Sequence, residues 1–580
     1  MDFRSFSWIF ICSKFIYRPL KTILKAQMFE LTQIKLRLDD CTDLHHTQQA
    51  LVRAVTRELH IKPSTIHDIS LARISVDARK KRNVHFVANA FVNTTDEKNV
   101  LNQLDPNIKK RINRVDTSRQ TFTHLNKTTL AKAAREERPI VVGAGCAGLF
   151  CTLALAEAGL EPLLIERGRD AYQRTHDIDH FYKTAKLNPN SNIQFGLGGA
   201  GTFSDGKLNT GTKNKLHRLI LDTFVDAGAP KDILWEAKPH IGSDILPQVV
   251  TNIAQRILAL GGEICYDTRL MTINRCSTGA IQSIIVRNTQ TNVEETIKCK
   301  RLVLATGHSA RDIFMMLNAQ KFKLERKTFA MGVRIEHLQA AIDAAQYGPA
   351  AGHPALSPSS YKLVSHLKNG RSLYSFCMCP GGEVVGATSL EQHVVTNGMS
   401  RYARNGKNAN SALLVNVKPN DLPGDDILAG IKLQTSCEKQ AYLKAGATYA
   451  APVQLVGDFL RAHPSGGCAN IKPTYPLGVS WTSIDDLLPS HVIDTLRQAL
   501  PLLNQRIKGF SNEEAVLTGV ETRSSSPITI LRDKTCHALE AEGLYPCGEG
   551  AGYAGGIMSA ATDGLRCAQA IFEDLQEKSF

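Results

Sequence analysis

The chain has 580 residues, 43% of them hydrophobic and 21% charged, which is long enough for two or three domains and too apolar for a wholly disordered protein. Its fourteen cysteines would indicate a disulfide framework only in a short secreted chain, so we expect free thiols and a cytoplasmic location. The formal net charge of +14 is uneven, because residues 1–137 hold 24 basic and 14 acidic side chains. Any acidic or anionic partner would therefore involve the N-terminal part of the chain.

Residues 1–27 form a basic extension with a short apolar run, Trp8 to Cys12. The run is far shorter than the roughly 20 residues that span a bilayer, so we predict no transmembrane segment here. The extension is interpreted as disordered or artefactual, with a basic amphipathic anchor or a targeting peptide as alternatives.

Residues 28–100 resemble a small, basic α+β domain, with a strand in FELTQIKLRL, a helix around QQALVRAVTREL and two further strands, SLARISVDA and VHFVANAFV. The turn Arg79-Lys80-Lys81-Arg82 is either a solvated hairpin tip or a phosphate or partner contact. Residues 101–137 read as a polar linker with helical pieces.

From Arg138 the sequence is a strand, a glycine turn, a helix and a second strand: RPIVVGAG, CAGLFCTLALAEAG and EPLLIERG. Gly143, Gly145 and Gly148 have the dinucleotide spacing G-x-G-x-x-G. They allow the tight turn, the approach of a pyrophosphate and close packing of helix on strand. Glu166, 23 residues after Gly143, is placed to accept hydrogen bonds from ribose hydroxyls, and the helix N-terminus favours phosphate.

The glycine spacing occurs twice more, and context separates the three matches. Gly196, Gly198 and Gly201 in IQFGLGGAGTFSDGKL follow NPNSN rather than a buried strand, so we interpret this match as a loop that lies along the bound cofactor rather than as the phosphate turn. Gly550, Gly552 and Gly555 follow a strand and precede a helix, but no second strand follows. A single complete fingerprint remains.

The end of the chain, GLYPCGEG followed by the helix SAATDGLRCAQAIFEDL, suggests the closing half of a discontinuous FAD-binding domain. Glu549 would bind the ribityl hydroxyls, and the helix dipole would stabilise the reduced flavin. We predict an α/β fold: a Rossmann-type, glutathione-reductase-like FAD domain in two parts, 138–310 and 515–580. An inserted α+β cap or substrate domain, 311–514, lies between them, after a small hairpin sheet and the ATG stretch at Gly307.

Several strings, among them FGLGGAGTFSDGKLNT, LATGHSARDIF, TGVETRSSSPITILRD and GLYPCGEGAGYAGGIMSAATDG, are similar to those of the bacterial family of uncharacterised FAD-dependent dehydrogenases, or NAD(P)/FAD-dependent oxidoreductases. The resemblance covers roughly residues 138–575. It implies FAD binding and implies no substrate.

We therefore predict an FAD-dependent oxidoreductase that transfers a hydride to or from flavin N5 with a small molecule; NAD(P)H or the substrate itself would be the electron donor. The alternative is a flavoprotein that acts on or docks to RNA through its basic N-terminal domain. No aromatic stacking set accompanies the basic residues, and Phe86 and Phe91 fit a core, so a nucleic-acid partner is not favoured.

The candidate site residues divide into two sets. Catalytic candidates are Lys207, His308 and Arg523; Ser204, Asp205 and Arg311 are polar neighbours on the same loops. The predicted cofactor contacts are Gly143, Gly145, Cys146, Ala147, Gly148, Glu166, Arg167, Gly199, Thr202, Gly307, Gly548, Glu549, Gly555, Gly556 and Met558.

Cys377 and Cys379 lie two residues apart in an expected strand, which puts both sulfurs on one face. Three interpretations are open: plain buried cysteines, which the sequence favours, a redox pair, or metal ligands. The chain has neither H-E-x-x-H nor paired C-x-x-C spacing, so we predict no metal site.

Overall fold

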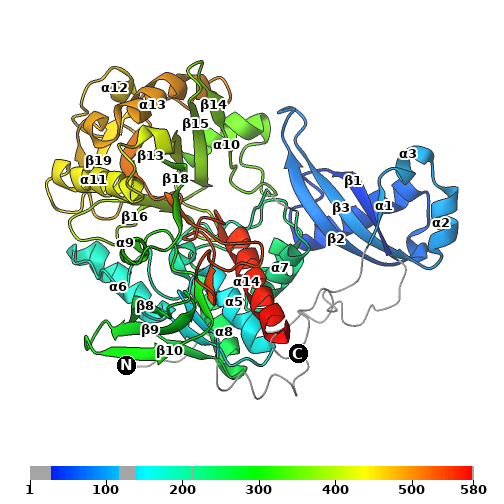
Figure 1. Ribbon diagram of the computed structural model, residues 1–580. Helices are drawn as coiled ribbons and strands as arrows, with labels where there is room; N and C mark the ends of the chain where they lie inside the picture. Colours follow the sequence, from blue (N-terminus) through cyan, green and yellow to red (C-terminus); the bar gives the residue numbers. More distant parts are fainter. Residues whose placement is uncertain (1–27, 116–137, 212, 578–580) are drawn as a thin grey trace, which may run out of the picture. The chain divides into compact units, whose positions relative to one another are not determined.

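The computed structural model describes residues 28–115, 138–211 and 213–577, which divide into an N-terminal unit and a larger unit (Figure 1). Within these residues no helix combines the length and apolar character that crossing a membrane requires. The predicted extension, residues 1–27, lies outside the described residues, as does 116–137 of the predicted linker.

The N-terminal unit is a four-stranded sheet in the order β2-β3-β1-β4, with helix α1 in its core. Its elements are β1 (Met28–Leu36), α1 (Leu44–Leu59), β2 (Ile66–Asp77), β3 (His85–Thr94), α2 (Glu97–Gln103), α3 (Pro106–Lys109) and β4 (Ile112–Arg114). Because β4 pairs with β1, this unit extends beyond the predicted boundary at residue 100.

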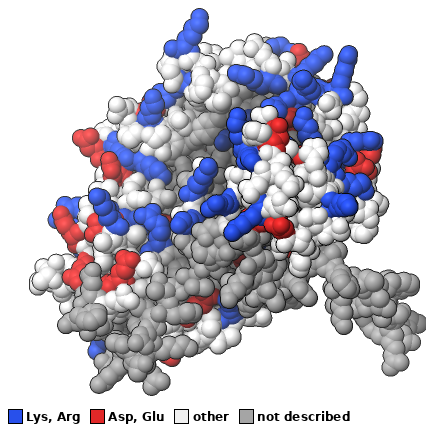
Figure 2. Space-filling model, turned by 90° about the vertical axis from the view of Figure 1, so that its right-hand side faces the viewer, with Lys and Arg blue, Asp and Glu red and all other residues white. Residues whose placement is uncertain are grey.

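Two features of the N-terminal unit bear on a nucleic-acid partner. Phe86 is only 9% exposed and Phe91 is partly buried, so neither ring stands free for a base to stack on. The basic turn, residues 79–82, is exposed, and Arg79 pairs with Asp77 at 2.5 Å. Basic side chains are spread over the face shown in Figure 2, with acidic side chains among them. The RNA alternative gains no support from this arrangement.

The larger unit is built on a parallel five-stranded sheet in the order β23-β11-β5-β6-β7. The strands are β5 (Ile140–Val142), β6 (Leu163–Ile165), β7 (Glu263–Cys265), β11 (Leu302–Leu304) and β23 (Leu544–Pro546). The last strand of the chain thus pairs beside the strand that ends in the ATG stretch, as the discontinuous domain requires.

Side chains of this sheet alternate between two cores, because successive strand residues point to opposite faces. Val141 packs with helices α5 (Cys146–Glu157), α8 (Leu246–Ala259) and α14 (Ile557–Glu577), and Figure 1 shows α5 and α14 side by side. Ile140 and Val142 pack on the opposite face against the antiparallel sheet β8 (Thr268–Arg275), β9 (Ile281–Asn288) and β10 (Glu294–Lys298).

A second, seven-stranded sheet has the order β14-β15-β18-β13-β21-β19-β20. Its strands are β13 (Phe329–Leu338), β14 (Val364–His366), β15 (Ser372–Cys379), β18 (Asn408–Val417), β19 (Ala451–Leu455), β20 (Val479–Trp481) and β21 (Val516–Glu521). Helices α11 (Ala429–Lys444), α12 (Val456–Leu460) and α13 (Ser490–Leu503) contribute to its core. Two small sheets pair β12 (Leu324–Arg326) with β22 (Ile528–Ile530) and β16 (Glu383–Gly386) with β17 (Thr396–Met399).

Strand pairing changes both predicted boundaries of the inserted region, 311 and 514. Helix α9 (Arg311–Ala319) packs in the core of the parallel sheet, so the insertion begins after it. Strand β21 pairs with β13 and β19, so the seven-stranded sheet continues to Glu521. The pairing of β21 with β13 brings Gly332 opposite Glu521, a separation in sequence that local patterns cannot reveal.

Arg174, on helix α6 (Ala171–Thr184), organises the loop that contains IQFGLGGAG. Its side chain is fully buried, at 0% exposed, and lies over the ring of Phe203 at 4.8 Å. It donates five hydrogen bonds to backbone carbonyls of this one loop: Asn192 at 2.8 Å, Ile193 at 2.9 Å, Gly196 at 3.3 Å, Leu197 at 2.7 Å and Gly199 at 2.9 Å. The guanidinium replaces the regular backbone pairing that this loop lacks.

We expect Arg174→Met to lower the free energy of unfolding by about 3–5 kcal/mol, because it removes the donors of five carbonyls in a buried loop. Arg218→Met is the matched control: Arg218 lies on an exposed helix face in an i,i+4 pair with Asp222, and its removal should cost about 0.5 kcal/mol or less. Urea denaturation followed by circular dichroism measures both. Equal midpoints for the two variants would contradict the role given to Arg174.

Candidate functional site

A cavity of about 340 Å³ lies against the carboxyl ends of β5, β6, β11 and β23 and reaches residues of the seven-stranded sheet. This volume is within the range of small-molecule and cofactor sites, and the position is the one that open parallel α/β sheets use for ligands. Most predicted site residues line the cavity: Gly143, Gly145, Cys146, Ala147, Glu166, Arg167, Gly199, Lys207, Gly307, His308, Arg523, Glu549, Gly555 and Gly556.

The fingerprint turn has the close approaches that its glycines were predicted to allow. Gly143 has φ +103°, and a Cβ there would lie 2.4 Å from the carbonyl oxygen of Ala305. A Cβ on Gly148 would lie 1.8 Å from the oxygen of Gly143, so this glycine serves helix packing. Helix α5 begins at Cys146, and its N-cap residue, Gly145, provides no side-chain cap. Its first N–H groups are therefore available to an anion.

The stretch IQFGLGGAGTFSDGKL lies directly against this turn. Gly198 forms a parallel bridge with Gly145 and donates to the oxygen of Ala144 at 2.8 Å. Gly199 has φ +63°, and a Cβ at this position would lie only 2.9 Å from the Cα of Gly145, so a side chain does not fit here. The second glycine match thus forms the opposite wall of the phosphate turn, and only its later residues, Ser204 and Lys207, reach farther along the cavity lining.

Glu166 joins the two glycine loops. One carboxylate oxygen, Oε2, accepts from the backbone of Ala144 at 2.7 Å, and Oε1 accepts from Gly168 at 2.9 Å and Gly196 at 3.0 Å. A carboxylate has about four acceptor positions, so one remains for a ligand hydroxyl. The residue after it, Arg167, pairs with Asp312 at 2.8 Å and lies over Phe195 at 4.3 Å.

Glu549 follows β23 and faces the cavity. Its carboxylate accepts no hydrogen bond from the described residues, and burial, with help from Cys377, raises its pKa to about 7 against the opposing charge of Lys327. A partly buried carboxylate without a partner suits a ligand that presents hydroxyl groups. Together with the uncapped helix and the glycine cradle, it fits the ribityl chain and pyrophosphate of FAD.

Lys207 lies at a charged junction beside the cavity. Its Nζ lies 3.1 Å from the carboxylate of Asp205, which also binds Arg404 through two hydrogen bonds of 3.0 and 2.6 Å. Burial disfavours the charge of Lys207, but the sulfurs of Cys379 and Cys377 together with Asp205 outweigh burial and raise the pKa of Lys207. Asp205 is fully buried and does not line the cavity, contrary to the expectation that it faces the flavin.

Arg523 and His308 line the cavity beside a buried carboxylate. Arg523 donates to both oxygens of Glu438, at 3.0 and 2.6 Å, and to Ser389 at 2.6 Å. Arg311 also pairs with Glu438, at 2.7 Å, and lies away from the cavity. Burial, with help from Arg523 and Arg311, lowers the pKa of His308 to about 3, so its imidazole is neutral at neutral pH.

Four predicted cofactor contacts do not line the cavity. Gly148 packs helix on strand, Thr202 donates to the oxygen of Leu197, and Met558 is buried in the helical core. Gly548 donates its N–H to Asp563 at 2.8 Å and shapes the turn before Glu549. Neighbours of these residues in sequence line the cavity instead: Ala147, Gly201, Glu549 and Ile557.

The cavity also has polar residues that sequence reasoning did not single out: Gln194, Asn209, Asn397, Glu521 and Ser524. Glu521 binds Arg334 through two hydrogen bonds of 2.5 and 3.0 Å, and both side chains are buried. The signal available in the sequence was Arg334 itself, a charge within the apolar strand FAMGVRIEH.

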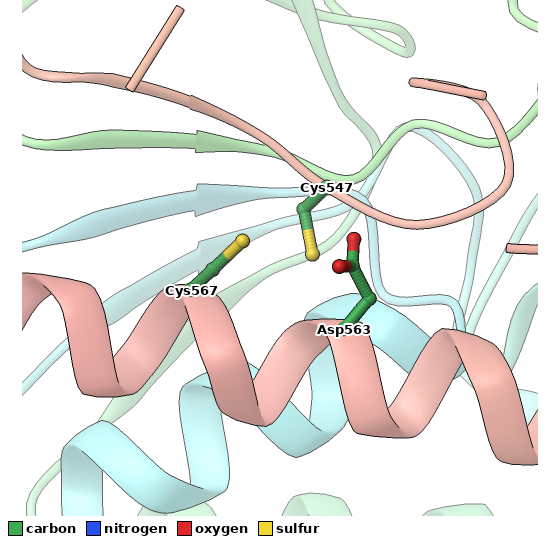
Figure 3. A group of neighbouring side chains, drawn as sticks. All are labelled: Cys547, Asp563 and Cys567. Atoms are coloured by element: carbon green, nitrogen blue, oxygen red, sulfur yellow. The ribbon is translucent and has the colours of Figure 1, made fainter. Parts of the chain in front are cut away.

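Cys547, Asp563 and Cys567 form a buried group whose ligand atoms lie within 4.8 Å of one another (Figure 3). The carboxylate of Asp563 already binds Arg532, at 2.6 and 3.0 Å, in addition to Gly548. Arg532 also donates to the sulfur of Cys567 at 3.6 Å. The guanidinium thus supplies the positive charge that a metal ion would bring, and the group fixes the turn that carries Glu549.

Parts of the chain are similar to known proteins. Residues 328–524 match the family model "FAD-dependent protein, C-terminal domain-like", which corresponds to the seven-stranded sheet with β21 included. Residues 28–93 match a domain of unknown function. Similar solved structures include the flavin-dependent brominase Bmp2, with 13% identity, 76% and 79% of the two chains covered and a TM-score of 0.36. Another is glycerol-3-phosphate dehydrogenase from Bacillus halodurans complexed with FAD, with 10% identity, 78% and 67% covered and a TM-score of 0.32.

An uncharacterised protein of Clostridium beijerinckii is 41% identical over 547 residues, which cover 94% of this chain and 98% of that protein. This similarity extends over both units of the structure. The chain therefore belongs to the same family as the Clostridium protein, and its residues 328–524 carry the C-terminal domain of an FAD-dependent protein family.

Proposed function

We propose that the protein binds FAD in the described cavity and transfers a hydride between flavin N5 and a small-molecule substrate. The observation that carries the proposal is the composition of the cavity lining. The turn with the dinucleotide spacing, the carboxylate of Glu166 and Glu549, which accepts no hydrogen bond from the described residues, line the same space as residues of the seven-stranded sheet. Bound FAD supplies the hydride acceptor or donor.

Different residues of the cavity bind different parts of the cofactor. The N-terminus of α5 binds the pyrophosphate, and Glu166, already oriented by three backbone N–H groups, accepts from the adenosine ribose. Glu549 accepts from the ribityl hydroxyls. Gly555 and Gly556 precede α14 and let its N-terminus approach the flavin ring, whose reduced form is negatively charged.

The remaining lining residues orient the substrate. Arg523 keeps N–H groups beyond those bound by Glu438 and Ser389, and it offers them to a substrate carbonyl or carboxylate. His308 is neutral, so it donates or accepts a hydrogen bond without adding charge. Lys207 adds positive charge and favours the reduced flavin. The electron donor is either NAD(P)H bound transiently or the substrate itself.

Anaerobic stopped-flow mixing of the purified holoprotein with NADH, with NADPH and with a panel of reduced metabolites tests the function. We expect a yellow protein whose flavin absorbance is bleached by at least one donor and restored by an oxidised small molecule. A protein that neither retains FAD nor takes it up on reconstitution would contradict the proposal.

Gly145→Ala separates cofactor binding from folding. A Cβ at this position meets only the Cα of Gly199, at 3.9 Å, and the backbone φ of −70° suits any residue. The added methyl group instead occupies space that the pyrophosphate needs, so FAD should bind about 10-fold more weakly or worse, while the melting temperature of the cofactor-free protein stays unchanged. Fluorescence titration with FAD measures the affinity.

Gly148→Ala is the contrasting control for this experiment, because its Cβ would lie 1.8 Å from a backbone oxygen. That variant should lower the melting temperature of the cofactor-free protein itself. Unchanged FAD affinity in Gly145→Ala would show that the phosphate lies elsewhere.

Glu549→Gln should have opposite effects on the free and the loaded protein. Because burial raises the folded-state pKa from 4.5 to about 7, ionisation of Glu549 destabilises the cofactor-free fold increasingly as pH rises from 4.5 to 7. The amide has no such penalty, so at pH 8 the cofactor-free variant should be more stable than wild type by about 1–3 kcal/mol, with little difference at pH 4.

The FAD affinity of the Glu549→Gln variant at pH 8 should fall about 10-fold, because a charged acceptor is lost. Melting temperatures at both pH values and FAD titrations measure these effects, and a variant that matches wild type throughout would refute the role of Glu549.

A further inference from the structure

Strand β15 has a bulge at Cys377, beside the cavity. Phe376 pairs with Ala412 and Cys379 with Asn410 on β18, so β15 has one residue more than its partner over this interval. Cys377 has φ +43°, a left-handed conformation that costs a non-glycine residue about 1 kcal/mol or more. Bulges of this kind commonly redirect a side chain near an active site. Here Cys377 lines the cavity, whereas Met378 enters the core of the sheet.

The second cysteine lies immediately behind the first. The side chains of Cys377 and Cys379 influence each other electrostatically, and the sulfur of Cys379 donates its hydrogen bond to the backbone oxygen of Cys377 at 3.2 Å. Cys379 is fully buried and does not line the cavity. The pair therefore consists of one sulfur that faces the cavity and one that reaches it only through the first.

Two cations make this corner electropositive. Lys207 and Arg334 lie near both sulfurs, and Arg334 donates to the backbone oxygen of Cys377 at 3.3 Å. The carboxylates of Asp205 and Glu521 offset part of the positive charge of these two side chains. The neighbouring side chain of Cys379 lowers the pKa of Cys377 well below its ordinary value, with help from Lys207 and Arg334 and against burial and Asp205. The pKa of Cys379 is raised well above its ordinary value. Cys377 is the thiolate of the pair and Cys379 the thiol.

The other two interpretations of the pair fit less well. A plain core cysteine is found at Cys151, which lies among apolar helix residues and whose pKa burial raises. Cys377 instead has a left-handed backbone and lines a cavity between cations, the environment of reactive cysteines. Metal binding is disfavoured, because Lys207 and Arg334 would repel a cation held by these two sulfurs.

We propose that Cys377 and Cys379 form a dithiol–disulfide couple that exchanges an electron pair with the flavin. This inference rests on the proposed FAD site and adds to it a second redox centre within the chain.

The exchange balances within the site. The Cys377–Cys379 disulfide accepts an electron pair from the reduced flavin anion, and the S–S bond breaks. The electron pair enters at Cys377, the sulfur that faces the cavity, so Cys379 is the leaving group and takes the one proton that the reduced flavin would release. Cys377 ends as the thiolate, which Lys207 and Arg334 stabilise. In the opposite direction, oxidised flavin takes the electron pair and that proton, and the S–S bond forms again.

Anaerobic dithionite titration of the air-oxidised holoprotein tests the couple. Wild type should consume twice as many reducing equivalents per flavin as Cys379→Ser or Cys377→Ser, because each variant can reduce only the flavin. Cys468→Ser, which removes an exposed cysteine, is the matched control and should titrate as wild type.

Mass spectrometry gives a second measurement that does not depend on flavin absorbance. Trypsin releases both cysteines in one peptide, residues 372–401, since no Lys or Arg lies between them and Arg401. Alkylation under denaturing conditions should leave this peptide unmodified and lighter by two hydrogen atoms before reduction, and doubly alkylated afterwards.

A wild-type protein that binds FAD, takes up a single electron pair and yields a doubly alkylated peptide before reduction would overturn the couple and leave the FAD proposal intact. A protein that cannot bind FAD would overturn both. Misfolding of a serine variant does not affect the decision, because the wild-type stoichiometry and the peptide mass are sufficient.

Discussion

The site depends first on the buried guanidinium of Arg174. The loop of residues 192–199 contains three glycines and has little regular backbone pairing, so it cannot hold a single conformation through its own hydrogen bonds. Arg174 satisfies five of its carbonyls and fixes the loop where Gly196 donates to Glu166 and Gly198 donates to Ala144. Arg174 therefore stabilises the loop that packs against the dinucleotide turn, although Arg174 itself does not line the cavity.

Buried ion pairs play the corresponding part where the seven-stranded sheet meets the cavity. Arg334 pairs with Glu521 across two neighbouring strands, and Arg523 pairs with Glu438 on α11. Such pairs contribute little net stability, because desolvation of the charges offsets their attraction. Their value here is positional: a desolvated charge must keep its partner, so each pair fixes the elements that carry it. Arg523 and Glu521 consequently face the cavity with little freedom to turn.

The sequence was sufficient for the parts of the fold that follow from local rules. The fingerprint turn, Glu166 and the strand before Glu549 are each defined by a few consecutive residues, and all were found where predicted. Contacts between residues far apart in sequence could not be predicted from the sequence. No residue near Arg174 indicates that its side chain binds five backbone carbonyls, and no residue near 514 indicates that β21 pairs with β13. Side-chain direction was the second limit, as Thr202 and Met558 show, because a correct motif does not specify which of its members face a ligand.

The cysteine pair shows how one backbone irregularity changes an interpretation. Regular alternation along a strand would place both sulfurs on one face of the sheet at equal depth, and nothing would then distinguish them. The extra residue in β15 breaks that symmetry, since it brings Cys377 to the cavity and leaves Cys379 buried behind it. Lys207 reaches the same point from the loop IQFGLGGAGTFSDGKL, and Arg334 reaches it from β13. An unequal pair of thiols beside two cations arises only from the tertiary structure, and this inequality makes Cys377 the sulfur that receives the electron pair and Cys379 the leaving group that takes the proton.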